Sequence, residues 1–264
     1  MTSPTPERFL RRPLPRAAAA FTAAAGLLLA VAACDHDEPS ENANDETVFS
    51  EPIERIEIET RNGHLEFIAS DSDQVKLSRE FQWSNEKPAS AEVIDDGVLR
   101  IEVAGCTGIG SRACGISYTF ELPADIELVA STTAGNIRTV GMNSEQELHT
   151  DAGNIDGLGV ISSTVDVSTY AGNANMHFVD ETDDVSVHSR AGNVEVRFSV
   201  PPNDVSARSD AGNVTVVLPE GGTMYDVDAK SNTHSAEVHV VESDEAERKI
   251  NAQTRAGNVL VDYP

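Results

Sequence analysis

Val, Ile and Thr recur at every second position in short runs from Ile53 onward, and Gly, Asn and Asp separate these runs. Alternation of apolar and polar residues is typical of β-strands that bury one face, whereas a helix repeats its apolar residues every three to four positions. Only residues 243–249 carry a weak helical pattern. The chain is therefore predicted to be an all-β protein made of many short strands.

The tripeptide Ala-Gly-Asn occurs six times between these strands. Its glycines are Gly135, Gly153, Gly172, Gly192, Gly212 and Gly257, so successive copies lie 18, 19, 20, 20 and 45 residues apart. The third residue before each glycine always carries a hydroxyl group: Thr132, Thr150, Thr169, Ser189, Ser209 and Thr254. The fifth residue before each glycine and the second residue after it are apolar. Fixed positions at a period of about 20 residues indicate a structural repeat.

Two degenerate copies fit the same frame, one around Gly63 and one around Ala236. The second copy lies within the 45-residue gap. The repeat domain is therefore predicted to span residues 51–264, with longer strands interrupting it between Gln74 and Pro123.

Each repeat is predicted to be two short strands that meet at a glycine corner. We expect the glycine to supply a positive φ, the alanine to leave room for a close approach of backbones, and the asparagine to hydrogen-bond the local backbone. Gly-Asn is also a hairpin turn, which would give an antiparallel meander or sandwich. A β-solenoid with about 20 residues per coil accounts better for the repeated alanine and hydroxyl, because stacked hydroxyl groups can pair with those above or below. Such a solenoid is expected to be right-handed, as parallel crossovers are.

The first 33 residues resemble the signal peptide of a bacterial lipoprotein. Four arginines precede an apolar run from Ala17 to Ala33, and Val31-Ala32-Ala33-Cys34 ends it like a lipobox. The resemblance implies that residues 1–33 are removed and that Cys34 is acylated, which would hold the protein in the cell envelope by lipid. The run is short for a membrane-spanning helix, although a plain N-terminal membrane anchor is the alternative. Arg11-Arg12 leaves export by the Sec or the twin-arginine route open.

The formal net charge is −25, with 19 Lys and Arg against 44 Asp and Glu. Such a surface disfavours nucleic acid and anionic headgroups as partners and permits a cationic ligand. Residues 34–50 are acidic and almost free of apolar side chains, so they are predicted to be a disordered spacer. In an oxidising exterior Cys106 and Cys114 are predicted to form a disulfide, because too few further ligands lie near them for a metal site.

The positions that flank the corners predict no catalytic residues. Stacking of the coils would place Arg190 beside Asp210 as a surface ion pair, and His149 two coils from His188, too far apart to share a metal ion. Three columns of outward positions contain no carboxylates on neighbouring coils, which acid–base glycoside chemistry would need. The sequence also lacks a phosphate loop, a dinucleotide fingerprint and the calcium repeat of β-helices. We therefore predict no cofactor and no metal.

The repeats, the strand–Ala-Gly-Asn–strand corners and the leader together resemble the putative-adhesin family of bacterial surface proteins, a domain of unknown function. The resemblance covers residues 53–264 and implies a β-helix-like architecture at the cell surface, with no catalytic residues to transfer. The expected function is a lipid-anchored, non-catalytic module for surface binding, adhesion or envelope structure, with an unknown envelope or extracellular ligand. The alternatives are an envelope-stress accessory that senses antimicrobial peptides and a carbohydrate-active β-helix enzyme.

Overall fold

The computed structural model describes residues 41–104 and 114–264, in which the regular elements are β-strands arranged in two sheets. Sheet A has the strand order β1 (Glu41–Phe49), β4 (Val75–Trp83), β7 (Cys114–Leu122), β3 (Leu65–Ala69), β9 (Ile137–Val140), β11 (Ile155–Val160), β13 (Ala174–Phe178), β15 (Val194–Phe198), β17 (Val214–Val217), β21 (Val259–Asp262) and β19 (Ala236–Val238). Sheet B has the order β18 (Asp226–Ser231), β20 (Lys249–Ala256), β16 (Asp204–Ala211), β14 (Asp184–Ala191), β12 (Thr164–Ala171), β10 (Gln146–Ala152), β8 (Glu127–Ala134), β2 (Arg55–Asn62), β6 (Val98–Ala104) and β5 (Ala89–Asp95).

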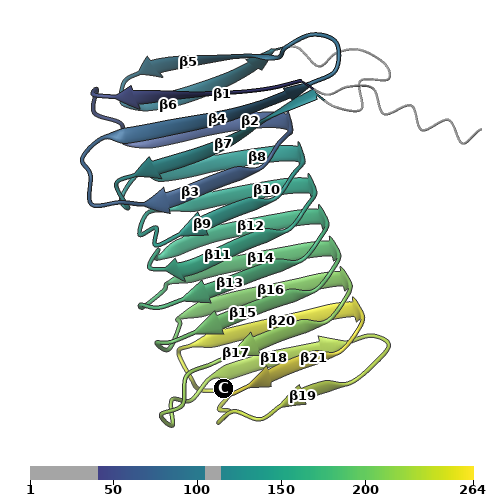
Figure 1. The fold of residues 1–264 in the computed structure, drawn as a ribbon. Helices are drawn as coiled ribbons and strands as arrows, with labels where there is room; N and C mark the ends of the chain where they lie inside the picture. Colours follow the sequence, from purple (N-terminus) through teal and green to yellow (C-terminus); the bar gives the residue numbers. More distant parts are fainter. Residues whose placement is uncertain (1–40, 105–113) are drawn as a thin grey trace, which may run out of the picture. The chain divides into compact units, whose positions relative to one another are not determined.

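One strand of sheet B, a corner and one strand of sheet A make one coil, and successive coils stack with parallel strands (Figure 1). The register follows the repeat, since Val165, Val185 and Val205 occupy equivalent positions on β12, β14 and β16. The predicted β-solenoid of about 20 residues per coil is confirmed. The antiparallel alternative is wrong for the repeats, because the corner joins strands of opposite sheets and each strand bonds to the next coil.

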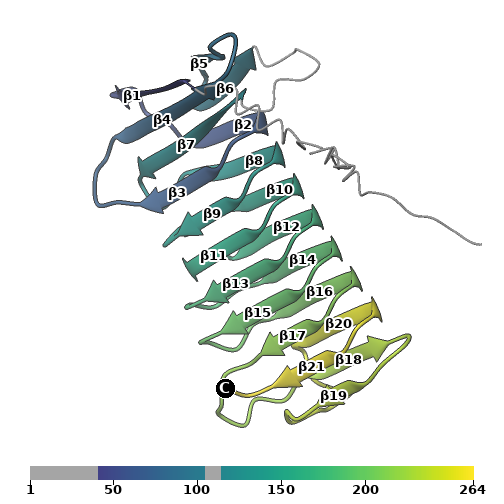
Figure 2. The same cartoon turned by 45° about the vertical axis from the view of Figure 1, so that its right-hand side comes forward.

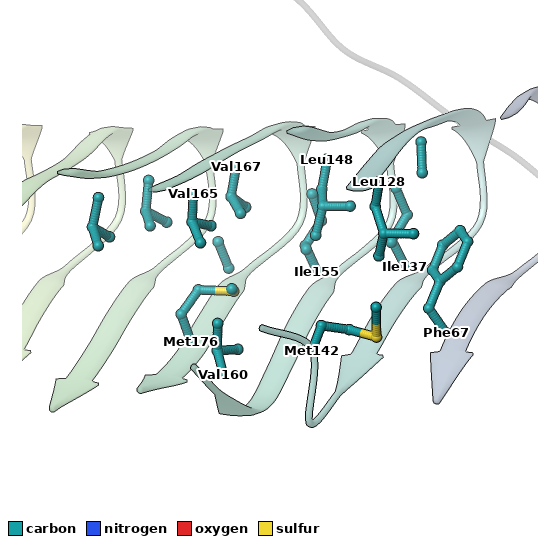
Figure 3. Close-up of a cluster of buried hydrophobic side chains, with 14 of the residues drawn as sticks. Phe67, Leu128, Ile137, Met142, Leu148, Ile155, Val160, Val165, Val167 and Met176 are labelled. Atoms are coloured by element: carbon teal, nitrogen blue, oxygen red, sulfur yellow. The ribbon is translucent and has the colours of Figure 1, made fainter. Parts of the chain in front are cut away.

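The core is a narrow apolar layer between the two sheets. Alternate residues of each strand point inward, so that the apolar set of the sequence pattern meets along the whole stack. Figure 3 shows Leu128, Leu148 and Val167 of sheet B facing Ile137 and Ile155 of sheet A. Aromatic rings stack between coils in the same way, with ring centroids 5.0 Å apart in the pairs Phe67–Phe120 and Phe178–Phe198.

Chain order and stacking order differ at both ends of the solenoid (Figure 2). The coil β18–β19 precedes β20–β21 in the sequence, yet it stacks outside it, and β20 pairs with β16 on one side and with β18 on the other. At the other end β6–β7 follows β2–β3 in the sequence and stacks outside it. The degenerate copy predicted around Ala236 does form a coil, at the end of the stack, but the predicted frame is wrong by two residues. Ser231 pairs with Thr254 and Ala236 with Val259, so His234 takes the corner position.

The prediction that residues 34–50 form a disordered spacer is wrong for Glu41–Phe49, which form strand β1 at the edge of sheet A. Its antiparallel partner β4 supplies Arg79, whose side chain is only 9% exposed. The Arg79 guanidinium donates to Asp45 Oδ1 over 2.6 Å and to Thr47 Oγ1 over 2.8 Å, and it also pairs with Glu92 of β5. Composition alone missed this strand because its order depends on contacts with β4, in which Arg79 pairs with Asp45 from 34 residues away.

Among residues 41–104 and 114–264, antiparallel pairing is confined to this N-terminal end, where β1 pairs with β4, β4 with β7, and β5 with β6. No helix among the described residues is long and apolar enough to cross a membrane.

Candidate functional site

The corner glycines, the residues that the sequence singles out most strongly, lie where two coils approach most closely. A Cβ atom on Gly192 would lie 1.9 Å from the carbonyl oxygen of Gly172, and one on Gly172 would lie 1.9 Å from that of Gly153. Gly172 and Gly192 have the expected positive φ, +158° and +159°, which residues with a side chain rarely adopt. The close approach of the coils is a second reason for glycine, which the sequence did not reveal.

The buried hydroxyl before each corner bonds to the backbone and not to the next hydroxyl, which corrects the expected hydroxyl ladder. Thr150 Oγ1 donates to the carbonyl of Gly135 over 2.9 Å, Ser189 Oγ to that of Gly172 over 2.9 Å, and Ser209 Oγ to that of Gly192 over 2.8 Å. Each hydroxyl thus binds the close-approaching carbonyl of the preceding coil and satisfies both polar groups inside the stack.

The asparagine side chains of the corners also hydrogen-bond from one coil to the next. The backbone N–H of Asn193 donates to Asn173 Oδ1 over 2.8 Å, and that of Asn213 donates to Asn193 Oδ1 over 2.8 Å. His64 takes the asparagine's place in its coil, where its Nδ1 accepts from the N–H of Asn136 over 3.0 Å. The glycine, hydroxyl and asparagine of the corner are therefore engaged in stacking, and a ligand site has to be sought elsewhere.

Of the predicted modification sites, Cys114 lies buried at the start of β7. Cys34 and Cys106 lie outside the described residues, so acylation of Cys34 and the Cys106–Cys114 disulfide stay predictions.

The outer face of sheet B carries a polar groove of about 900 Å³ over strands β12, β14, β16, β20 and β18. Its lining combines basic, acidic and small polar side chains: Asp166, Ser168, Ser186, His188, Arg190, Ser206, Arg208, Ser209, Asp210, Lys230, Asn232, Gln253, Thr254 and Arg255. The lining thus contains four Arg and Lys side chains but only two carboxylates, although the net charge of the protein is −25. We call this surface the cationic groove.

Two of its guanidinium groups have no carboxylate partner. Among the described residues, Arg208 and Arg190 form no ion pair, and Arg190 lies 4.9 Å from the ring centre of Tyr170 in a cation–π contact. Arg255 lies 3.5 Å from Asp210, and Lys230 lies 2.7 Å from Asp228. Exposed guanidinium groups without a carboxylate partner can bind an anion without first breaking an internal pair.

The expected Arg190–Asp210 ion pair is not formed, because the Asp210 carboxylate lies beside Arg255 and His188 instead. Its Oδ1 lies 3.5 Å from Arg255 Nε and 3.8 Å from His188 Nε2. The structure places β12 between the strands of His149 and His188, as expected for residues two coils apart. In the part of the chain that the structure describes, no group of three or more His, Cys, Asp or Glu could hold a metal ion.

The sequence reasoning missed carboxylates that do stack on neighbouring coils. Asp184 of β14 pairs in register with Asp204 of β16, and Glu147 of β10 with Asp166 of β12. Asp184 and Asp204 lie eight positions before their corner glycines, and Glu147 and Asp166 lie six positions before theirs. Both positions lie outside the three outward columns that the sequence pattern singled out. Glu145, Glu147, Asp166 and Asp184 line a hollow of about 330 Å³ beside the cationic groove, which we call the acidic hollow.

The family described as Toastrack DUF4097 matches residues 124–261. No curated protein matches the chain. Among solved structures, the chain is similar to a "putative cell adhesion protein" from Clostridium sporogenes at 12% identity and a TM-score of 0.41, covering 85% of this chain and 100% of that one. It is also similar to a "putative adhesin" from Bacteroides fragilis at 10% identity and a TM-score of 0.37, covering 84% and 97%. A "putative lipid binding protein" from Parabacteroides distasonis matches at 10% identity and a TM-score of 0.35, with the same coverage.

Proposed function

The chain belongs to the Toastrack DUF4097 family, and we propose that it is a lipid-anchored protein of the cell envelope whose solenoid is a non-catalytic surface binding module. The cationic groove is the observation that carries the proposal. It spans five neighbouring strands of one sheet, and its lining side chains other than Ser209 and Thr254 take no part in the hydrogen bonds of the corners. Rigid elements position binding groups better than loops do.

The lipid anchor is supported by the leader and by its place in the sequence. The lipobox cysteine, Cys34, stands seven positions before the first residue of β1, Glu41. An acyl group at Cys34 would therefore tether the repeat domain through its N-terminal end. A single acyl chain holds a protein on a membrane only weakly, so lipoprotein anchoring relies on more than one chain.

The anchor is tested by feeding cells a radioactive fatty acid and isolating the protein. Wild type and a Cys106→Ala control are expected to carry label in the membrane fraction, whereas Cys34→Ala is expected to carry none. Labelling that survives Cys34→Ala would remove the lipid anchor from the proposal.

Binding is tested with the full-length protein in detergent micelles and washed cell envelopes from the same cells. Arg208→Gln is expected to weaken retention, whereas Arg197→Gln, which removes the same charge from the outer face of sheet A, is expected to leave it unchanged. Equal retention of wild type and Arg208→Gln would show that the cationic groove is not the binding surface.

A carbohydrate-active enzyme is disfavoured by the surroundings of the stacked carboxylates. A general acid has to hold its proton near neutral pH, which usually requires shielding from water. Asp184 and Asp204 are both exposed. We expect no release of reducing sugar from acidic or neutral polysaccharides, and turnover that Asp184→Asn abolishes would overturn the non-catalytic assignment.

The acidic hollow supports a second candidate, an accessory that senses cationic antimicrobial peptides. Four carboxylates line the hollow, and no basic side chain does. Capture of a cationic peptide should then fall steeply with salt and be lost in Glu147→Gln, while Arg208→Gln should leave it unchanged. Capture that ignores Glu147→Gln would exclude the hollow as the sensor.

A further inference from the structure

The basic side chains of the cationic groove come one from each of four successive coils. Arg190 belongs to β14, Arg208 to β16, Arg255 to β20 and Lys230 to β18, and these strands are neighbours in that order. Arg190 and Arg255 stand two positions before their corner glycines. Arg208 stands four positions before its glycine, and Lys230 shares that second column because both residues are in register with Gln253. Positive charge therefore runs along the solenoid axis and alternates between two parallel columns.

Within either column the cations lie two coils apart. Neighbouring strands are separated by about 4.8 Å, so this interval is about 10 Å. Asp210 stands between Arg190 and Arg255 in one column, and Gln253 stands between Arg208 and Lys230 in the other. Each column thus alternates a cation with a group that can accept a hydrogen bond.

A ligand complementary to this pattern carries an anionic group at every second unit and hydroxyl groups on the units between. Guanidinium groups bind carboxylates through two parallel hydrogen bonds, and Asp210, Gln253 and Ser206 can pair with sugar hydroxyls. Tyr170 of β12, 54% exposed, positions the Arg190 guanidinium beside the groove through their cation–π contact. We propose that the cationic groove binds a linear polysaccharide in which carboxylated and neutral sugars alternate, lying along the solenoid axis.

The surroundings of the groove disfavour more highly charged polymers. The acidic hollow adjoins it through the shared residues Asp166 and Ser186, and the chain as a whole carries a charge of −25. A nucleic acid carries a phosphate on every nucleotide, so phosphates next to those bound by the basic side chains would face carboxylates. An alternating acidic polysaccharide can place its sparse carboxylates on the cations and neutral sugars beside the acids.

The inference rests on the proposed function and is tested by calorimetry with the full-length lipoprotein in detergent micelles. The probe is an octasaccharide of hyaluronan, in which glucuronate and N-acetylglucosamine alternate. Arg208→Gln is expected to weaken binding about tenfold, because a charge-assisted hydrogen-bonded contact is lost. The matched control is Arg197→Gln, which changes the net charge by the same amount. Arg197 is 44% exposed and pairs with Glu195. The control is expected to bind like wild type.

Three further probes decide between ligand classes. A neutral chitin octasaccharide, an oligogalacturonate with a carboxylate on every sugar, and a single-stranded oligonucleotide are each expected to bind more weakly than the hyaluronan fragment. Tighter binding of any of them, or equal losses in Arg208→Gln and Arg197→Gln, would overturn the inference. If hyaluronan does not bind and does not displace the protein from cell envelopes, while Arg208→Gln still weakens envelope retention, the polysaccharide assignment fails and the proposed function stands.

Discussion

Replacement of a corner glycine by alanine tests how much the close approach of the coils adds to the conformational reason for glycine. In Gly192→Ala the new Cβ would lie 1.9 Å from the carbonyl oxygen of Gly172 and 2.5 Å from its carbonyl carbon. Real Cβ atoms essentially never approach another heavy atom closer than 3.0 Å, so the two coils must separate locally by about 1 Å.

The structure sets the size of the effect. Two hydrogen bonds that involve side chains cross this corner close to the new atom, Ser189 Oγ to Gly172 O at 2.9 Å and Asn193 N to Asn173 Oδ1 at 2.8 Å. Lengthening both by about 1 Å would break them, at roughly 1 kcal/mol each, and overpacking adds about 1–3 kcal/mol. We expect Gly192→Ala to lower the free energy of unfolding by about 3–5 kcal/mol.

Gly221→Ala is the matched control. Gly221 has a similar φ of +146°, but a Cβ there would meet nothing within 4 Å. Gly221→Ala should therefore lower the free energy of unfolding only by the conformational cost of alanine at a positive φ, on the order of 1 kcal/mol.

Both variants are measured by guanidinium chloride unfolding, followed by far-ultraviolet circular dichroism and by fluorescence of the single tryptophan, Trp83 in β4. Trp83 reports on the N-terminal end of the stack, so a shift of the circular dichroism transition alone would mean that the coils around Gly192 unfold separately. Equal destabilisation in Gly192→Ala and Gly221→Ala would refute the close-approach explanation.

Three further predictions follow from buried polar groups. Ser209→Ala should cost about 1 kcal/mol by leaving the Gly192 carbonyl unpaired, while Ser206→Ala on the outer face should cost little; equal values in denaturant unfolding would contradict this. Arg79→Met should release β1 by leaving Asp45 and Glu92 without their cation, seen as new proteolytic cleavage within residues 41–49; continued protection would show that backbone pairing alone holds the strand. Burial raises the pKa of Tyr118 to about 12, so the unfolded chain loses this proton first and stability should fall between about pH 10 and 12; a Tyr118→Phe variant should show a shallower fall in the same unfolding assay.

The sequence by itself determined the repeating unit. Strand alternation follows from the need to bury one face of each sheet, and the Ala-Gly-Asn frame marks every regular coil because each copy obeys the same stacking constraint. The hydroxyl position was correctly predicted to lie inside, although its partner is a backbone carbonyl. A frame of identical positions shows which residues face inward, but the specific atoms that bond depend on the distance between coils.

The tertiary structure alone decided the order of the coils at the two ends. The copies around Ala236 and Gly257 fit the same frame, so spacing cannot tell which of the two pairs with β16. That choice also sets the order of the cations in the groove, because it places Arg255 of β20 between Arg208 of β16 and Lys230 of β18. Strand β1 was hidden for a related reason: its acidic composition predicts disorder, and its order comes from pairing with the distant strand β4, which also supplies Arg79. The local sequence pattern predicts which side chains of a segment are buried. Which distant segments come into contact depends on how the coils pack in three dimensions.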